Sequence, residues 1–97
     1  MSIRWSPEAR GDLDRLVDFM FMHDAGLADD IERQLVQAPR LLLDFPRRGT
    51  RLSEFEPREI RELRIGRYLL RYELAGTEIR VLRLFHLRED RSQFDNR

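Results

Sequence analysis

Hydrophobic and polar positions alternate most clearly between Arg58 and His86. This stretch reads as three strands separated by two breaks, one at Gly66 and one at Ala75-Gly76. Glycine adopts the positive φ that two-residue hairpin loops require, so both breaks predict tight turns. The sequence therefore predicts a three-stranded antiparallel meander.

The two turns set an expected register. A turn at Gly66-Arg67 places Glu62 opposite Arg71, and a turn at Ala75-Gly76 places Arg71 opposite Arg80. Because side chains alternate between the two faces of a strand, this register predicts one apolar face. Its members are Leu63, Ile65, Tyr68, Leu70, Tyr72, Leu74, Ile79, Val81 and Phe85.

The other face of the meander is predicted to be charged. It is either a binding surface, on which arginines and His86 converge, or a solvated face with cross-strand ion pairs such as Glu62 with Arg71. Arg83 falls on the apolar face, so either its guanidinium extends past the sheet margin or the register slips near the end of the strand. The members of the charged face are Glu62, Arg64, Leu69, Arg71, Glu73, Arg80, Leu82, Leu84 and His86.

Two helices are expected before the meander. Residues 2–5 alternate and predict a short strand near a sheet edge. Ser6-Pro7-Glu8 supplies an N-cap serine, a proline at the first helical position and an acid in the first turn, so a helix should run from there to between His23 and Gly26. A second apolar stripe from Leu27 to Leu42 predicts another helix, which Phe45-Pro46 should end.

These elements predict an α+β fold: an N-terminal strand, a helical hairpin and then a three-stranded antiparallel meander, with the helices packed on one sheet face. The chain has 97 residues and is expected to form a single domain over residues 1–97. It has no cysteine, which excludes disulfides and thiolate metal sites, and neither a metal nor a cofactor is expected. No apolar run approaches the roughly 18 residues of a membrane span, so we expect a cytoplasmic protein without a membrane partner.

Charge is balanced over the chain but uneven along it. All eighteen basic residues are arginine, and they equal the acids in number. Residues 1–46 carry five arginines against nine acids, whereas residues 47–97 carry thirteen against nine. Arginine forms bidentate contacts with carboxylate and phosphate but cannot act as a general base. A net charge of zero weakens the case for direct nucleic-acid binding.

A loop between residues 47 and 57 is a second candidate site. Arg47, Arg48 and Arg51 are close together there and could hold a phosphate, or they could simply be solvated; both readings stay open. His23 follows the first helix, where a histidine is more often solvated and favoured by the helix dipole than a metal ligand.

Four strings in this order resemble the RelE/ParE superfamily of bacterial type II toxins. They are IRWSPEARGDL, FPRRG, REIRELRIGRYLLRYEL and VLRLFHLRED, and together they cover nearly the whole chain. The pattern is closer to the ParE branch, whose last strand typically ends in a basic-apolar-apolar-His segment followed by arginine and aspartate. The matching positions are Arg83, Leu84, Phe85, His86, Arg88 and Asp90.

The resemblance implies a toxin that a cognate antitoxin holds inactive. It also implies DNA gyrase as the target in the ParE branch and mRNA on the ribosome in the RelE branch. RNA cleavage needs a base, an acid and positive groups near the phosphate, and RelE-type nucleases use lysines, arginines and a tyrosine or histidine. This chain has no lysine, and His86 is the one side chain on the charged face of a type that titrates near neutral pH. The catalytic set is thus incomplete, which favours a gyrase inhibitor over an endoribonuclease with His86 as its catalytic residue.

Two groups of contact residues are expected on this reading. The antitoxin is expected to be a ParD-like, DNA-binding protein that docks an amphipathic segment with acidic residues facing the arginines. The expected antitoxin contacts are Leu13, Leu16, Met20, Leu69 and Leu82. The expected target or phosphate contacts are Arg64, Arg71, Arg80, Arg83 and Arg88.

Overall fold

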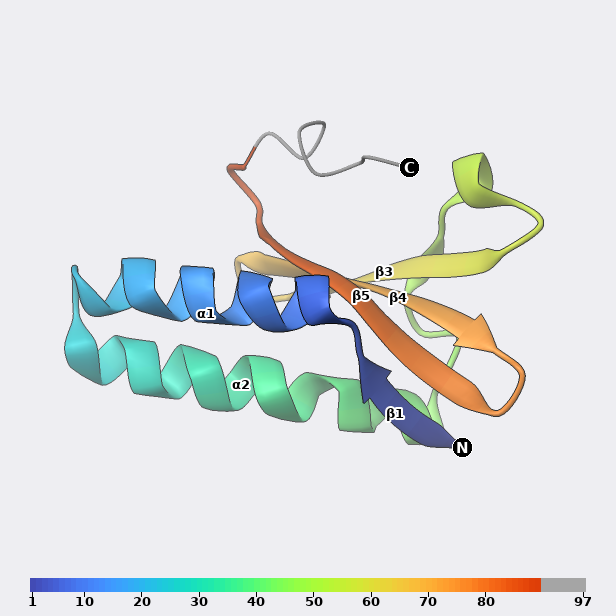
Figure 1. Cartoon of the computed structure of the whole chain (residues 1–97), viewed down its shortest axis with the longest axis horizontal. Coiled ribbons are helices and arrows are strands. Elements are labelled where there is room, and N and C mark those ends of the chain that lie inside the picture. Colours follow the sequence, from blue (N-terminus) through green and yellow to red (C-terminus); the bar gives the residue numbers. More distant parts are fainter. Residues whose placement is uncertain (90–97) are drawn as a thin grey trace.

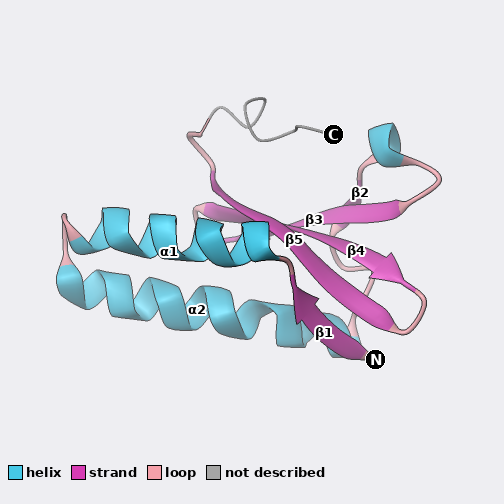
Figure 2. Ribbon diagram, viewed as in Figure 1, coloured by secondary structure: helices cyan, strands magenta, loops and turns pink. Residues whose placement is uncertain are grey.

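The computed structural model describes residues 1–89, in which two helices cover one face of a mixed sheet (Figure 1). In this part of the chain five strands lie in the order β1-β5-β4-β3-β2, with β1 parallel to β5 and the other neighbours antiparallel (Figure 2). The predicted α+β fold is confirmed, and two short strands extend the predicted meander on both sides. The elements are β1 (Ser2–Trp5), α1 (Pro7–Phe21), α2 (Ala25–Asp44), β2 (Thr50–Arg51), the 3-10 turn η1 (Ser53–Phe55), β3 (Glu59–Ile65), β4 (Tyr68–Ala75) and β5 (Glu78–His86).

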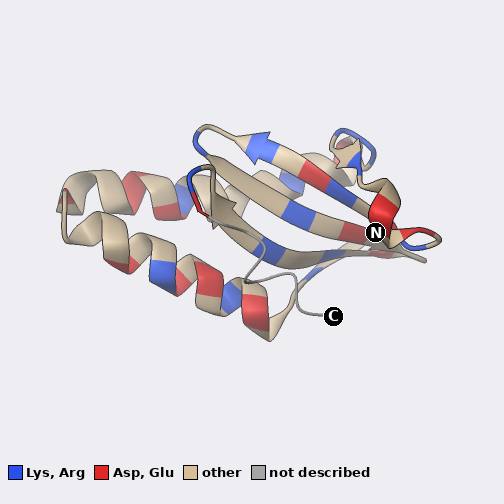
Figure 3. Cartoon of the chain, turned by 90° about the horizontal axis from the view of Figure 1, so that it is seen from above, with Lys and Arg blue, Asp and Glu red and all other residues tan. Residues whose placement is uncertain are grey.

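The helix ends follow from local capping. The Ser6 side chain accepts a hydrogen bond from the Ala9 backbone N–H at 2.9 Å and so begins α1 as predicted. Asp24 caps α2 in the same way through the Leu27 N–H at 3.1 Å. The two helices lie side by side, and the turn between them projects beyond the sheet (Figures 1 and 3).

The core lies between the helices and the sheet. Burial of apolar area in this single interface is the main source of folding free energy. The helices contribute Ala9, Leu16, Ile31, Leu35 and Leu42, and the sheet contributes Leu63, Tyr68, Leu70, Tyr72, Ile79, Val81 and Leu84.

The structure confirms the first predicted hairpin. In the second hairpin the turn lies at different residues from those predicted. Ile65 pairs with Tyr68 across the first turn, where Gly66 has a φ of 59°. The second turn consists of Gly76 and Thr77, because Ala75 pairs with Glu78.

A β-bulge at Leu82 then changes the register again. Tyr72 pairs with Val81 but Arg71 pairs with Arg83, so Leu82 is an extra residue on β5. One extra residue moves every later side chain to the opposite face. Leu84 therefore takes the place predicted for Phe85 in the core, and of the two alternatives for Arg83 the slipped register is the right one.

The first helix holds this bulge in place. Ser6 donates from its backbone N–H to the Val81 carbonyl and from its hydroxyl to the Leu82 carbonyl, both at 2.9 Å. Asp12 is 4% exposed, and its carboxylate accepts hydrogen bonds from the Leu84 N–H at 2.9 Å and from Arg83 Nε at 2.8 Å. The start of α1 thus supplies partners for the polar groups that the bulge leaves unpaired in the ladder.

The FPRRG string also has a structural role. The buried Tyr72 hydroxyl donates to the Pro46 carbonyl at 2.7 Å and accepts from the Gly49 N–H at 3.0 Å. A Cβ on Gly49 would lie 2.8 Å from the Glu62 carbonyl oxygen, so this close approach requires glycine. These hydrogen bonds therefore anchor the loop after α2 to strand β4.

Candidate binding site

The charged face of the sheet is largely occupied by its own ion pairs. Figure 3 shows the acidic and basic positions interspersed along its strands. Arg71 is 6% exposed and donates from Nε and Nη2 to Glu62 at 3.0 and 2.8 Å, which confirms the predicted cross-strand pair. Its guanidinium carbon also lies 5.1 Å from the ring centre of Phe55 and 5.2 Å from that of Phe85. Arg71 is thus held in the fold by a carboxylate and two aromatic rings.

A second ion pair lies further along β4. Buried Glu73 accepts from Arg58 at 2.8 and 2.9 Å, and Arg80 lies 3.9 Å from the same carboxylate. The hydrogen bonds from Arg58 are the main cause that lowers the pKa of Glu73, against the opposing effect of burial. The carboxylate therefore stays ionised and the arginines around it stay neutralised.

The five arginines predicted to contact the target differ in their partners. Arg71 pairs with Glu62, Arg83 pairs with Asp12, and Arg80 donates to Glu78 at 2.9 Å. A phosphate would have to compete with those carboxylates. Arg64 and Arg88, in contrast, form no ion pair with any residue between 1 and 89. The assignment of these arginines to target binding stays a prediction.

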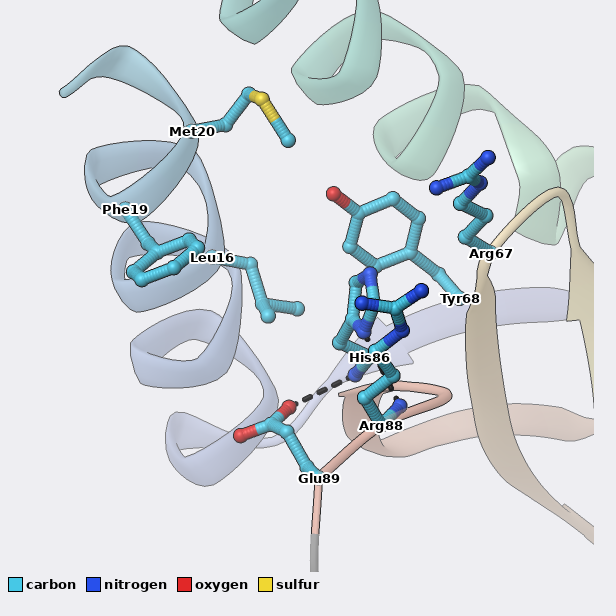
Figure 4. A pocket seen from close by; sticks show the side chains of 8 residues that line it. All are labelled: Leu16, Phe19, Met20, Arg67, Tyr68, His86, Arg88 and Glu89. Carbon is cyan, nitrogen blue, oxygen red and sulfur yellow. Dashed lines mark hydrogen bonds between the residues drawn. The ribbon is translucent and has the colours of Figure 1, made fainter. Parts of the chain in front are cut away.

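A pocket of about 380 Å³ opens at the C-terminal end of β5, just before Arg88 in the sequence (Figure 4). Side chains of α1 form one wall, and the sheet side contributes a tyrosine and a histidine that lie against each other. A smaller hollow of about 170 Å³ shares Arg67, His86 and Arg88 with it and is also lined by Arg64 and Leu87. The residues that line the larger pocket are Leu16, Phe19, Met20, Arg67, Tyr68, His86, Arg88 and Glu89.

His86 occupies a different place from the one predicted. The bulge turns it from the charged face toward the pocket, where its ring meets that of Tyr68 edge to face at 5.2 Å between centres. Its Nδ1 accepts from the Arg88 backbone N–H at 3.1 Å, so the neutral ring carries its proton on Nε2. Its backbone N–H donates to Glu89 at 2.7 Å, and Glu89 also pairs with Arg15 of α1. These contacts tie the end of β5 to the helix.

Sequence reasoning missed four members of the pocket: Phe19, Arg67, Tyr68 and Glu89. Burial raises the pKa of Tyr68, so its phenol is protonated at neutral pH. The hydroxyl points toward Met20 and makes no hydrogen bond within residues 1–89 (Figure 4). Arg67 stands in the predicted turn next to Tyr68, so its sequence position alone was a signal that it lies at this end of the sheet.

The residues predicted to contact an antitoxin do not form one patch. Leu16 and Met20 line the pocket, and Leu13 packs against the core beside them. Leu69 pairs with the buried Phe85 on the sheet face opposite the helices, and Leu82 is the bulge residue. This assignment also stays a prediction.

The other sequence candidates have structural partners. Arg47 donates to Glu59 at 2.9 Å and Arg51 lies 3.4 Å from Glu56, which leaves Arg48 as the loop arginine without an ion pair within residues 1–89. His23 Nδ1 lies 2.9 Å from the Phe19 carbonyl oxygen. Over the described part of the chain no cluster of potential metal ligands occurs, and no helix is long and apolar enough to cross a membrane.

Comparison with known proteins identifies the family. The family model described as the ParE toxin of the type II toxin-antitoxin system, parDE, matches residues 3–91. The chain belongs to the ParE toxin family. Membership of this family implies an antitoxin partner for the chain. Comparison with curated protein sequences found no match.

A solved structure supports the fold. It is titled "Chromosomal ParDE TA system from P. aeruginosa" and superposes with a TM-score of 0.76 at 22% sequence identity. The match covers 90% of this ParE-family chain and 96% of the other. At this identity the likeness shows a common fold, and it is consistent with the family assignment.

Proposed function

We propose that this ParE-family toxin inhibits DNA gyrase in the cytoplasm and is neutralised by a DNA-binding, ParD-like antitoxin. The observation that carries the proposal is the match of residues 3–91 to the ParE toxin family model. The resemblance seen in the sequence points to gyrase as the target of that branch. Inhibition of gyrase requires a surface that binds the enzyme, and no catalytic group of the toxin has to take part.

The chemistry of the pocket supports this reading. Burial raises the pKa of Tyr68, so its phenol keeps its proton near neutral pH and the phenolate that could act as a base is scarce. His86 already accepts at Nδ1, so Nε2 is the ring nitrogen left to face a ligand. The nearby Arg67 and Arg88 can bind anions but cannot accept protons. A single imidazole without a lysine is a sparse set for hydroxyl activation.

The test uses the antitoxin-free toxin with purified gyrase and supercoiled plasmid. We expect blocked supercoiling together with linear DNA covalently linked to gyrase, and we expect neither when the antitoxin is bound first. The absence of both effects at a large molar excess of folded toxin would reject gyrase as the target.

Endoribonuclease activity on translating ribosomes is the second candidate. It is favoured by one observation, the contact between Tyr68 and His86 beside two arginines, which the sequence had placed on different faces. The test is mRNA cleavage by the toxin and by its His86→Ala and Tyr68→Phe variants. Cleavage that both substitutions abolish in folded protein would support a nuclease, and unchanged toxicity of His86→Ala would count against it.

A further inference from the structure

Half of the arginines that form no ion pair within residues 1–89 gather at one end of the molecule. These three, Arg64, Arg67 and Arg88, line the hollow around His86, and we call them the arginine rim. Three guanidinium groups close together repel one another unless a ligand supplies negative charge. Within residues 1–89 the arginines outside every ion pair are Arg10, Arg40, Arg48, Arg64, Arg67 and Arg88.

The pocket beside the rim is mainly apolar. Leu16, Phe19 and Met20 of α1 face Tyr68 across it (Figure 4). Phe19 is 64% exposed, so water now covers apolar surface that a ligand could bury. The volume of about 380 Å³ lies at the lower end of the range of ligand pockets, and it suits one bulky apolar group.

We propose that this pocket binds a peptide segment of a partner protein in which one bulky apolar side chain is flanked by carboxylates. The apolar side chain would enter between α1 and Tyr68, and the carboxylates would accept bidentate hydrogen bonds from Arg67, Arg88 and Arg64. Arginines that have no carboxylate partner within residues 1–89, next to an apolar depression, fit such a segment in both shape and charge.

A nucleic acid fits the same surface less well. Its phosphates could use the rim, but the wall formed by Leu16 and Met20 offers nothing to the polar edge of a base. Tyr68 and His86 contribute polar side-chain atoms to the pocket lining. The inference concerns binding alone and holds whether the toxin acts on gyrase or on the ribosome.

The experiment measures fluorescence anisotropy with a fluorescein-labelled decapeptide that contains one leucine flanked by four glutamates. Two matched peptides replace either the glutamates with glutamine or the leucine with alanine. We expect saturable binding of the first peptide, about tenfold weaker binding of each matched peptide, and weakening by added salt.

Variants of the chain locate the site. Arg67→Gln with Arg88→Gln should weaken the peptide about tenfold or more, whereas Arg40→Gln with Arg48→Gln removes the same charge elsewhere and should change little. Phe19→Ser should also weaken binding. Phe21→Ser is the matched control, because Phe21 is 60% exposed but does not line the pocket.

Three results would overturn the inference. Equal binding of all three peptides, or equal loss in both arginine double variants, would show that only net charge matters. Binding of a ten-nucleotide single-stranded RNA or DNA that the rim variant loses, without peptide binding, would assign the site to nucleic acid. A concentration-dependent dimer that Phe19→Ser abolishes, without peptide binding, would assign it to a second copy of the chain.

Discussion

Two groups of arginines share the same sheet, and their surroundings differ. Arg71 and Arg83, in the middle of the sheet, hold carboxylates at 2.8 to 3.0 Å and lie close to the ring of Phe85. The arginine rim, at the end of β5 and the β3–β4 turn, is without carboxylate partners in residues 1–89. The first group stabilises the fold, and the second forms the proposed ligand site because it has no ion pair in residues 1–89. Acids and arginines are equal in number in this chain, so the net charge does not point to a binding site. The arginines that form no ion pair in residues 1–89 are better candidates for ligand contacts.

The largest loss of stability is expected on removal of the carboxylate that pairs with Arg83. Asp12→Ala removes the acceptor for Arg83 and for the Leu84 N–H, both at the bulge. Breaking a buried ion pair by removing one partner costs about 3–5 kcal/mol, so we expect destabilisation of about 4 kcal/mol. Urea unfolding followed by circular dichroism measures it.

Asp14→Ala is the control for this substitution, because Asp14 is on the same helix but exposed. It should change stability by less than about 0.5 kcal/mol. Equal stability of the two variants would mean that the ion pair between Asp12 and Arg83 does not stabilise the fold. It would then contradict the distinction between paired arginines that support the fold and unpaired ones that do not.

The same contacts explain why the sequence could predict the fold but not the register shift of β5 after Val81. The helices, the first hairpin and the apolar face up to Val81 follow from local periodicity, caps and glycines. The bulge depends on Ser6 and Asp12, which are more than 70 residues away from their partners on β5. Neither residue signals that role locally, since serine also caps the helix and aspartate is common on a helix surface.

The candidate site was missed for the same reason. With an unbroken register His86 belongs to the charged face and Tyr68 to the apolar one, so the pattern separates two side chains that in fact touch. The arginines could be found from the sequence, but only some of their ion pairs could be. Glu62 opposite Arg71 was predictable because both lie in the hairpin closed by Gly66. Asp12 with Arg83 was not, because it joins a helix to a distant strand.

The second expected effect concerns Arg71. Glu62→Ala removes the carboxylate that accepts from its Nε and Nη2 in a poorly exposed environment. We expect a loss of about 3 kcal/mol by the same physical argument. Arg71→Met in the Glu62→Gln background should recover part of it, because an apolar pair needs no desolvated charge. If Glu62→Ala lowers the free energy of unfolding by less than about 0.5 kcal/mol, the ion pair of Arg71 does not stabilise the fold, and Arg71 would resemble the arginines of the rim.

A smaller effect is expected from acid. Hydrogen bonds from Arg58 lower the pKa of Glu73, and those from Arg47 lower the pKa of Glu59. A carboxylate with a lowered pKa in the folded state stabilises the protein above its unfolded pKa, and this contribution is lost as pH falls through the folded pKa. The free energy of unfolding should therefore decline below about pH 5. Glu73→Gln should flatten that decline, whereas Glu54→Gln, at an exposed position in η1, should leave it unchanged.

The smallest effect on stability is expected at the rim itself. Arg67→Gln with Arg88→Gln should change the free energy of unfolding by less than about 0.5 kcal/mol, because neither guanidinium has a carboxylate partner within residues 1–89. Any change should be a gain, since removal of two neighbouring like charges relieves repulsion. Urea unfolding at low and high salt measures both the size and the sign.

The sign of this last effect separates the two groups most sharply. If the rim is a ligand site, stability rises on removal of its charges at low salt, the gain shrinks at high salt, and peptide binding falls in the same variant. If the rim arginines instead support the fold, the same substitutions lower stability by 1 kcal/mol or more at both salt concentrations. Clustered arginines that lower the stability of the folded protein are best explained by a function in binding. In that case the carboxylates that compensate their charge come from a partner protein and not from the chain itself.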